Sequence, residues 1–508
     1  MAIFGVVLKN PQNQMNPVDL TVFVLYFVII LGIGFYFYFR NKGAEEYYIG
    51  GRKMGYKHVG LSVVATDVGG GFSIGLGGLG FVMGISGSWM LFTGLIGAWL
   101  AAVFLIPKVK NLSTEQGFFT MPEVFNHFFN ARVAFLAGII SAIGYVGFSS
   151  SQMLAGARLA SASFDGMSLD TALYLMAFII IVYTALGGIK AVIYTDTFQW
   201  ILLLGGLIFV GIPVGYVAVG GFEVIRDTVA PEMLSLRNIS WQQLVNWGIT
   251  ILPIWFVGMT LYQRIYATRT EKEAQKAWYL AGLLEWPVMA FMGVLLGLFA
   301  YVAAEQGMFA YMGYESAALM HQEEGLPMLL RTVLPIGLMG LMMSAYFSAI
   351  MSTADSCLVA ASGNVTTDII EKVFKIDTSR ISMIRLSQLV TLALGILAFL
   401  LAAVFDTVLQ IMLYSYAFMV SALLVPIIGG LYWKRSSNAA AWWSMITGGT
   451  LTLGLTMLTD PALPFNVPFQ FAMPYGLDPI IYGLTASLVI FVSFSIWMPD
   501  RGPSRQAA

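Results

Sequence analysis

The feature that most constrains this chain is a series of long apolar stretches, about thirteen in all, separated by short polar connections. A helix needs about 20 mainly apolar residues to cross a bilayer, and most of these stretches approach or exceed that length. They do not alternate polar and apolar residues as barrel strands do, so we expect helices. The predicted spans are 18–40, 59–85, 88–107, 133–161, 168–187, 197–221, 246–267, 277–304, 330–358, 384–404, 407–432, 438–459 and 478–498.

Composition excludes a water-soluble globule. The chain is 58% hydrophobic and only 10% charged, with a mean hydropathy of +0.79. So much apolar surface cannot be hidden in one soluble core. No cleavable signal is predicted, and the single Cys357 excludes an intrachain disulfide. We therefore expect one transmembrane domain over residues 1–508, with any functional site in or beside the bilayer.

The basic residues predict the orientation. If the thirteen spans alternate, 21 of the 26 Lys and Arg residues fall in the connections on one side and five on the other. Cytoplasmic connections carry the excess of positive charge. The amino terminus is therefore predicted outside and the carboxyl terminus in the cytoplasm.

The second span contains an aspartate followed closely by three glycines, in Asp67-Val-Gly-Gly-Gly71. Each glycine costs about 1 kcal/mol in a helix relative to alanine, so the run favours an unwound segment, although close helix packing also favours glycine. A carboxylate at membrane depth is costly and indicates a functional role. Asp67 could line a cation site, meet a cationic group of a substrate, or be protonated and hydrogen-bonded; a buried structural contact is the alternative.

A second break is predicted in the seventh span, where Pro253 removes a helical hydrogen bond and glycines 248 and 258 flank it. A proline kink without a function is the competing interpretation. The two candidate breaks lie five spans apart, as expected if spans 2–6 and 7–11 are inverted five-helix repeats. We expect these repeats at 59–221 and 246–432, with a peripheral helix at 18–40 and two more at 438–498.

The ninth span carries a face of small and hydroxyl-bearing residues. Ala349, Ser352, Thr353 and Ser356 are three, four and seven residues apart, so they share one side of a helix. Small hard cations prefer such oxygen ligands, although serine and threonine hydroxyls often bond only to carbonyls of their own helix. With the predicted topology, this face and residues 65–68 could meet at similar depth.

Four segments resemble the sodium/solute symporter family, which includes sodium/proline, sodium/glucose and high-affinity choline carriers. They are Tyr48-Ile-Gly-Gly-Arg-Lys-Met-Gly55, Ala65-Thr-Asp-Val68, Tyr183-Thr-Ala-Leu-Gly-Gly-Ile-Lys-Ala-Val-Ile-Tyr-Thr-Asp-Thr-Phe-Gln199 and Met351-Ser-Thr-Ala-Asp-Ser356. The similarity runs from about residue 18 to 435, and the third segment is the most specific.

The resemblance implies an all-α membrane protein with a LeuT-type core of two inverted five-helix repeats. It implies sodium as the coupling ion, held by the carbonyls of Ala65, Val68 and Ala349 and the hydroxyls of Ser352 and Thr353. It also associates Asp196 with sodium release, whereas a loop residue paired with a nearby Lys or Arg is the plainer interpretation of Asp196.

The substrate is not specified by the resemblance. Asp67 and two segments near residues 154–173 are similar to the proline branch, but Gly71 and Phe148 replace its substrate-site aromatic residues. Val68-Gly-Gly-Gly71 is similar to the choline branch. However, Asp67 stands in this chain at the position where that branch has a tryptophan of its cation–π cage. The residues expected near the substrate are Asp67, Gly70, Phe72, Phe148, Gln152, Trp255 and Met259.

The function predicted is sodium-coupled symport of a small organic solute by alternating access. The solute could be an amino acid such as proline, a betaine- or choline-like compound, a sugar or a carboxylate. A proton-coupled carrier, or a receptor or channel derived from this fold, is the alternative. No catalytic residues are expected, because His58, His127 and His321 are scattered over both sides. We expect a monomeric unit in a bacterial-type inner membrane, with no nucleic-acid partner.

Overall fold

The computed structural model describes residues 16–40, 49–67, 69–164, 166–186, 189–371, 383–460 and 472–500. Over these ranges the chain is helical, and its extended pairing is one isolated parallel bridge between Met54 and Thr268. Helices lie over the described parts of all thirteen predicted ranges, with a non-helical stretch at 334–337 inside the predicted range 330–358. The predicted all-α class is therefore confirmed for the described residues.

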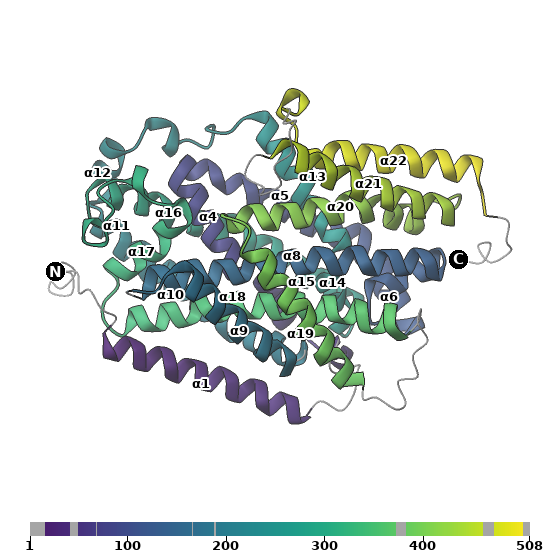
Figure 1. The fold of residues 1–508 in the computed structure, drawn as a ribbon, viewed down its shortest axis with the longest axis horizontal. Helices are drawn as coiled ribbons and strands as arrows, with labels where there is room; N and C mark the ends of the chain where they lie inside the picture. Colours follow the sequence, from purple (N-terminus) through teal and green to yellow (C-terminus); the bar gives the residue numbers. More distant parts are fainter. Residues whose placement is uncertain are drawn as a thin grey trace.

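The first half of the chain forms the helices from α1, at the lower edge of the molecule, to α12, at its left end (Figure 1). Their bounds are α1 (Pro17–Arg40), α3 (Tyr56–Asp67), α4 (Gly69–Met83), α5 (Trp89–Leu100), α6 (Ile106–Gln116), α7 (Met121–Phe128), α8 (Ala131–Ser163), α9 (Leu169–Leu186), α10 (Ile189–Gly206), α11 (Ile212–Ala218) and α12 (Gly221–Thr228).

The second half continues this pattern and ends in a helical pair, α21 and α22, at the upper right of Figure 1. The bounds are α13 (Trp241–Val257), α14 (Met259–Ala267), α15 (Glu271–Leu283), α16 (Ala290–Glu305), α17 (Gly325–Val333), α18 (Leu338–Gly363), α19 (Met383–Ala402), α20 (Val408–Tyr432), α21 (Asn438–Thr459) and α22 (Pro479–Trp497). The π-helix η7 (Leu284–Met289) joins α15 to α16, and the short 3-10 helix η10 (Gln322–Glu324) precedes α17.

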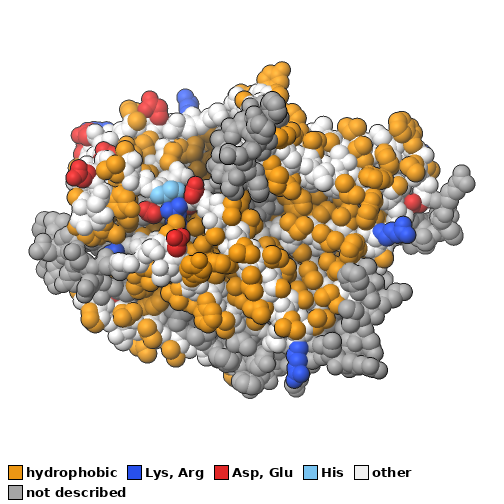
Figure 2. Space-filling view, viewed as in Figure 1, with side chains coloured by type: hydrophobic (Ala, Val, Ile, Leu, Met, Phe, Trp, Pro, Cys, Tyr) orange, Lys and Arg blue, Asp and Glu red, His pale blue; other side chains and the backbone are white. Residues whose placement is uncertain are grey.

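Seven described helical segments are long and apolar enough to cross a membrane, and an eighth qualifies if the bent pair α13–α14 is one span. Large apolar side chains lie on the outside of these helices, for example Phe209 and Phe178, which are 79% and 67% exposed. Hydrophobic side chains cover most of the described surface on the face shown in Figure 2. The molecule is thus a multi-pass membrane protein, and the count of thirteen spans stays a prediction.

Small residues set the distances between helices in the interior. A Cβ atom at Gly297 of α16 would lie 1.9 Å from the Gly77 carbonyl oxygen, and one at Gly80 of α4 would lie 2.2 Å from that of Val294. Glycines therefore let α4 and α16 approach to backbone contact, which is the usual way in which membrane helices pack. This packing holds α4, the helix that begins at the break described next, against α16.

Candidate functional site

The second predicted span is interrupted where the glycine run begins. Helix α3 ends at Asp67 and α4 begins at Gly69, whose φ of +53° is the left-handed conformation that suits glycine. A Cβ atom at Gly69 would lie 2.7 Å from the hydroxyl oxygen of Thr353. The predicted break is confirmed, and a glycine is required there both for the backbone turn and for the approach of α18.

Helix α18 presents its hydroxyl face to this break, as the sequence predicted. The Thr353 hydroxyl oxygen lies 2.9 Å from the Ala65 carbonyl oxygen of α3 and 3.0 Å from that of Ala349, one turn earlier in α18. The Ser352 hydroxyl donates to the same Ala349 carbonyl at 3.1 Å. The bonds to Ala349 are the back-bonds of the plainer interpretation, whereas the contact with Ala65 joins two helices.

Four of the five residues predicted to hold sodium therefore lie together between α3 and α18. They supply carbonyl and hydroxyl oxygens, which suit a hard monovalent cation as well as they suit calcium or magnesium. Val68, the fifth, lies outside the described residues.

Asp196 lies in α10 rather than in a loop, and it is fully buried. Its carboxylate accepts a 2.5 Å hydrogen bond from the Ser62 hydroxyl and lies 3.4 Å from a terminal nitrogen of Arg264. The Arg264 guanidinium also donates to the hydroxyls of Ser62, Thr66 and Ser356. One buried ion pair thus links α10, α14, α3 and α18 immediately beside the hydroxyl face.

This position of Arg264 corrects one prediction. The 21 basic residues counted on the predicted cytoplasmic side include Arg264, taken to follow the seventh span, but Arg264 lies inside α14 with 0% of its surface exposed. Proximity to the end of a span does not make a residue solvated, and an arginine can be buried when its donors are satisfied. The orientation itself stays a prediction.

The seventh span is interrupted at Gly258, not at the proline. Helix α13 continues through Pro253 to Val257, Gly258 has an extended backbone, and α14 follows at an angle of 44°. The predicted break is therefore confirmed, five residues later than the residue thought to cause it. Tyr145 donates or accepts a 2.9 Å hydrogen bond with Thr260, just after this break.

Three residues predicted near the substrate lie together at the first break. The Tyr416 hydroxyl is 3.3 Å from a carboxyl oxygen of Asp67, and its ring meets Phe148 edge to face at 5.2 Å. Gln152 accepts a 3.1 Å hydrogen bond from the backbone N–H of Gly71. Tyr416, on α20, was not among the predicted residues, because nothing in its local sequence indicates which helix it faces.

Trp255 and Met259, which were also predicted near the substrate, make their described contacts elsewhere. Trp255 packs on α5 at Gly97 and meets Trp278 of α15 at 6.3 Å. The Met259 sulfur accepts a hydrogen bond from the backbone of Met121 at 3.1 Å. The Phe72 side chain and the surroundings of Gly70 lie outside the described part of the chain.

Sequence reasoning missed a second carboxyl group at this depth, that of Glu285. It lies in η7, in the middle of the eighth predicted span, and is 0% exposed. The carboxyl group of Asp67 is a neighbouring acid, close enough for the two charges to interact. The sequence did indicate this residue, because a glutamate inside the apolar stretch 277–304 is as costly to bury as Asp67 and equally indicates a functional role.

Charged groups also join helices at the end of the molecule that carries η10 and α17. Arg158 of α8 forms a 2.8 Å ion pair with Glu324 and donates to the Asp406 carbonyl at 2.6 Å. The buried Glu323 accepts hydrogen bonds from the backbone N–H groups of Val408 and Leu409, at 2.9 and 3.2 Å, where α20 begins. Burial raises the pKa of Glu323 to about 7, because the charged form loses its hydration.

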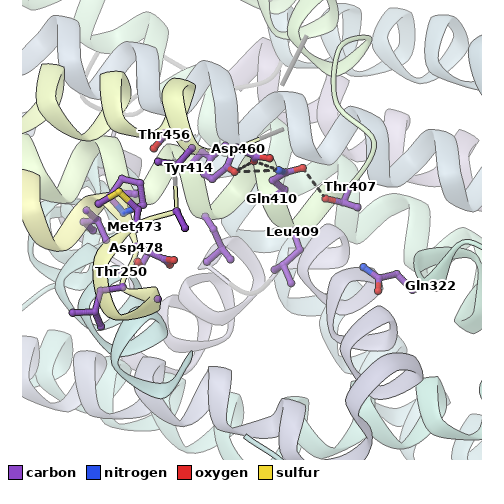
Figure 3. Close-up of a pocket in the computed structure, with 18 residues that line it drawn as sticks. Thr250, Gln322, Thr407, Leu409, Gln410, Tyr414, Thr456, Asp460, Met473 and Asp478 are labelled. Atoms are coloured by element: carbon purple, nitrogen blue, oxygen red, sulfur yellow. Dashed lines mark hydrogen bonds between the residues drawn. The ribbon is translucent and has the colours of Figure 1, made fainter. Parts of the chain in front are cut away.

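A cavity of about 510 Å³ opens near this end, between α13, α20, α21 and the start of α22 (Figure 3). Gln410 donates to Asp460 at 2.5 Å, and Tyr414 donates to the same carboxylate. Asp478 is bonded to Asn246 at 3.0 Å, and burial raises the pKa of Asp478 to about 6. The lining combines two acidic residues, Asp460 and Asp478, with apolar residues such as Leu409 and Leu413.

Two interrupted helices that meet a continuous helix bearing buried hydroxyl groups are the arrangement of a secondary membrane transporter, because such carriers bind their ligands at discontinuous helices. The sodium:solute symporter family matches residues 47–448. This chain belongs to that family of sodium-coupled solute symporters, and it is not an enzyme.

Relatives and solved structures agree with this placement. The chain is 26% identical to a sodium/glucose cotransporter of Vibrio parahaemolyticus, over 98% of this chain and 94% of that protein. It is 27% identical to a high-affinity proline transporter of Bacillus subtilis (strain 168), over 84% and 89% of the two chains. A Na⁺-coupled sialic acid symporter in a substrate-bound outward-open state has a similar fold, with a TM-score of 0.76 at 21% identity, over 96% and 99% of the two chains.

Proposed function

We propose that this chain carries a small organic solute together with sodium by alternating access, and that sodium binds between α3 and α18. The ligands would be the carbonyl oxygens of Ala65, Val68 and Ala349 and the hydroxyl oxygens of Ser352 and Thr353. The observation that supports this most directly is the Thr353 hydroxyl, which lies within 3.0 Å of carbonyl oxygens from both helices. A cation there would replace a weak hydrogen-bonded bridge by oxygen ligation.

The binding of sodium and of the solute would be coupled because both bind at the break between α3 and α4. Ala65, on the sodium side, and Asp67, on the proposed solute side, are two residues apart in α3. A solute that orders residues 67–71 would also order the sodium ligands, so each ligand would raise the affinity for the other. A membrane potential of about 100 mV adds roughly 2.3 kcal/mol per charge moved, which can drive accumulation.

The finer topology belongs to the same proposal. It has thirteen spans, an external amino terminus, a cytoplasmic carboxyl terminus and inverted repeats at 59–221 and 246–432. The proposed location is a bacterial-type inner membrane with a monomeric functional unit. The confirmed breaks in α3–α4 and α13–α14 support the repeats, because they fall at corresponding second and seventh spans.

The solute is proposed by class only. The names of the relatives include glucose and proline, and that of the structural neighbour sialic acid. We propose that Asp67, Gly70, Phe72, Phe148, Gln152, Trp255 and Met259 contribute to its site, and that Asp196 assists sodium release. The described contacts support Asp67, Phe148 and Gln152 most directly, since these three border the first break.

The experiment is a thermal-shift screen of purified protein against amino acids, betaines, sugars and carboxylates, each in sodium and in potassium. Uptake of the solute found is then measured against sodium concentration for Ser352→Ala with Thr353→Ala. The double variant should need at least about tenfold more sodium for half-maximal uptake, equal to about 1.4 kcal/mol.

The matched control is Ser344→Ala, on the same helix, whose hydroxyl bonds back to the Gly340 carbonyl at 2.6 Å. It should leave the sodium requirement unchanged. A double variant with normal abundance and a normal sodium requirement would remove the proposed site.

A further inference from the structure

Helix α18 begins with a cap that its own residues do not supply. Gly337 stands at the N-cap position, with a φ of +87°, and has no side chain that could accept a hydrogen bond. Serine, threonine, aspartate and asparagine are favoured at this position, because their oxygens accept from the unpaired N–H groups of the first turn. Here the acceptor comes from α1. One carboxyl oxygen of Asp19 accepts hydrogen bonds from the backbone N–H groups of Gly337 and Gly340, both at 2.7 Å.

The contact between Asp19 and the first turn of α18 is buried and closely packed. Asp19 is 4% exposed, and a Cβ atom at Gly340 would lie 2.4 Å from the Asp19 carbonyl oxygen. A glycine at position 340 therefore lets α1 approach to backbone contact. The partial positive charge at a helix N-terminus also favours a carboxyl group there. Asp19 thus fixes the place where α18 begins relative to α1.

Helix α1 follows α18 from this cap toward the proposed sodium ligands. The rings of Phe23 and Phe347 meet edge to face, with centroids 5.3 Å apart, and Phe347 lies two residues before Ala349. Each residue of a helix advances by about 1.5 Å, so Ala349 lies about 14 Å along the axis from Gly340. Helix α18 is continuous over Leu338–Gly363, so a shift of its first turn is transmitted along the helix and is not absorbed at a break.

The proposed sodium site needs α18 at one axial position. The Thr353 hydroxyl lies 2.9 Å from the Ala65 carbonyl oxygen of α3, so ligands from two helices must meet at one point. Oxygen ligands of hard cations occupy a narrow range of distances, about 0.3 Å wide for calcium. A small displacement of α18 along its axis therefore weakens ligation by Ala349, Ser352 and Thr353 together.

We propose that Asp19 is a positioning residue for sodium binding: by capping α18 from the peripheral helix α1, it holds the ligands of α18 at the depth where they meet α3. Asp19 does not touch the ion. The proposal rests on the sodium site proposed above and extends it to a helix that lies outside the predicted repeats.

The test is the rise in melting temperature of the purified full-length protein as sodium chloride replaces potassium chloride at constant ionic strength. Asp19→Ala should raise the sodium concentration at the midpoint of this rise at least about threefold, because part of the stability lost with a helix cap falls on the ligand positions. Asp19→Asn keeps an oxygen acceptor at the same place and should give a midpoint close to that of wild type.

The matched control is Ser437→Ala, which removes the cap of a helix without proposed sodium ligands. The Ser437 hydroxyl caps α21 by accepting a 3.2 Å hydrogen bond from the Ala440 N–H. This variant should lower the melting temperature without moving the sodium midpoint. If Asp19→Ala behaved in the same way, Asp19 would only stabilise the fold and the proposal would be overturned.

Gly340→Ala provides a second test and serves if Asp19→Ala does not fold. It keeps the carboxyl group but pushes α1 away from the first turn of α18, so it should also raise the sodium midpoint. Its control is Gly454→Ala in α21, where a Cβ atom would meet nothing within 4 Å and the midpoint should stay unchanged. Equal midpoints for these two variants would contradict the positioning role.

Ser352→Ala with Thr353→Ala separates this proposal from the sodium site on which it rests. A wild-type midpoint in the double variant would remove the sodium site and the role of Asp19 together. A raised midpoint in the double variant, with an unchanged midpoint in Asp19→Ala, would overturn the role of Asp19 alone.

Discussion

Two buried carboxyl groups adjoin α3, and they differ in what balances their charge. Asp196 has a partner from the chain, the Arg264 guanidinium, and a hydrogen bond from Ser62. Asp67 faces a second acid, Glu285, and a neutral Tyr416 hydroxyl. Charges are costly to bury unless they are paired, and of the two centres only the first contains an ion pair among the described residues.

The difference indicates that the two centres, which both contact α3, have different roles. The centre around Asp196 joins α3 to α10, α14 and α18 through bonds that need no ligand. The centre around Asp67 has one interhelical hydrogen bond, from Tyr416 of α20, and a neighbouring acid, Glu285 of η7. Opening the first centre would expose a guanidinium and a carboxylate at once, whereas opening the second would break no ion pair among the described residues.

The largest effect is expected from breaking the fixed pair. Arg264→Leu leaves Asp196 buried without its cation, which typically costs about 3–5 kcal/mol of stability. The variant should show a greatly reduced yield of folded protein and a lower melting temperature in detergent. Arg264→Leu combined with Asp196→Asn should recover part of the loss, because no unpaired charge remains. If Arg264→Leu alone were as stable as wild type, Asp196 would not need its charged partner, and the difference between the two centres would be contradicted.

A smaller effect is expected at Gly69, which lies between the two centres. Gly69→Ala should cost about 1–3 kcal/mol, from backbone strain at φ +53° and from contact with Thr353. Gly117→Ala is the matched control, since Gly117 has a φ of +73° with open space around its Cβ position. The Gly117→Ala variant should lose only the stability that corresponds to the backbone strain. Equal melting temperatures for the two variants would show that Thr353 does not pack closely at the break.

Glu323 is another buried carboxyl group, which accepts hydrogen bonds from two N–H groups at the start of α20. Its pKa is raised from 4.5 to about 7, so the folded protein holds a proton that the unfolded chain has released between these pH values. Its contribution to stability should therefore fall as pH rises from about 4.5 to 7, by at most about 1.4 kcal/mol per pH unit.

The measurement is the melting temperature of wild type and Glu323→Gln across this pH range. The difference between the two should change with pH in the direction just given. Asp478 contributes a change of the same sign in both proteins, because its pKa is also raised, and so cancels in the comparison. Glu223→Gln, at an exposed position, should follow wild type; a pH-independent difference for Glu323→Gln would contradict the assignment.

Sequence reasoning was most successful where a local pattern carried the information. The glycine run predicted the break after Asp67, and helical spacing predicted the face that contains Ser352 and Thr353. It was least successful where the partner is distant in sequence, because no local pattern indicates that Arg264 meets Asp196 or that Glu285 meets Asp67. In the seventh span the obvious helix breaker, Pro253, is accommodated inside α13, and Gly258 forms the break.

The smallest effect on stability is expected from Glu285→Gln, and that small effect is what separates the two centres. Glutamine has nearly the same shape as glutamate, and its amide can donate a hydrogen bond to Asp67. Among the described residues no Lys, Arg or His forms an ion pair with Glu285, so its removal leaves no unpaired positive charge there, and the melting temperature should correspond to a change within about 1 kcal/mol. A loss as large as that of Arg264→Leu would mean that Glu285 is balanced by a permanent charge, and the two centres would then be of one kind.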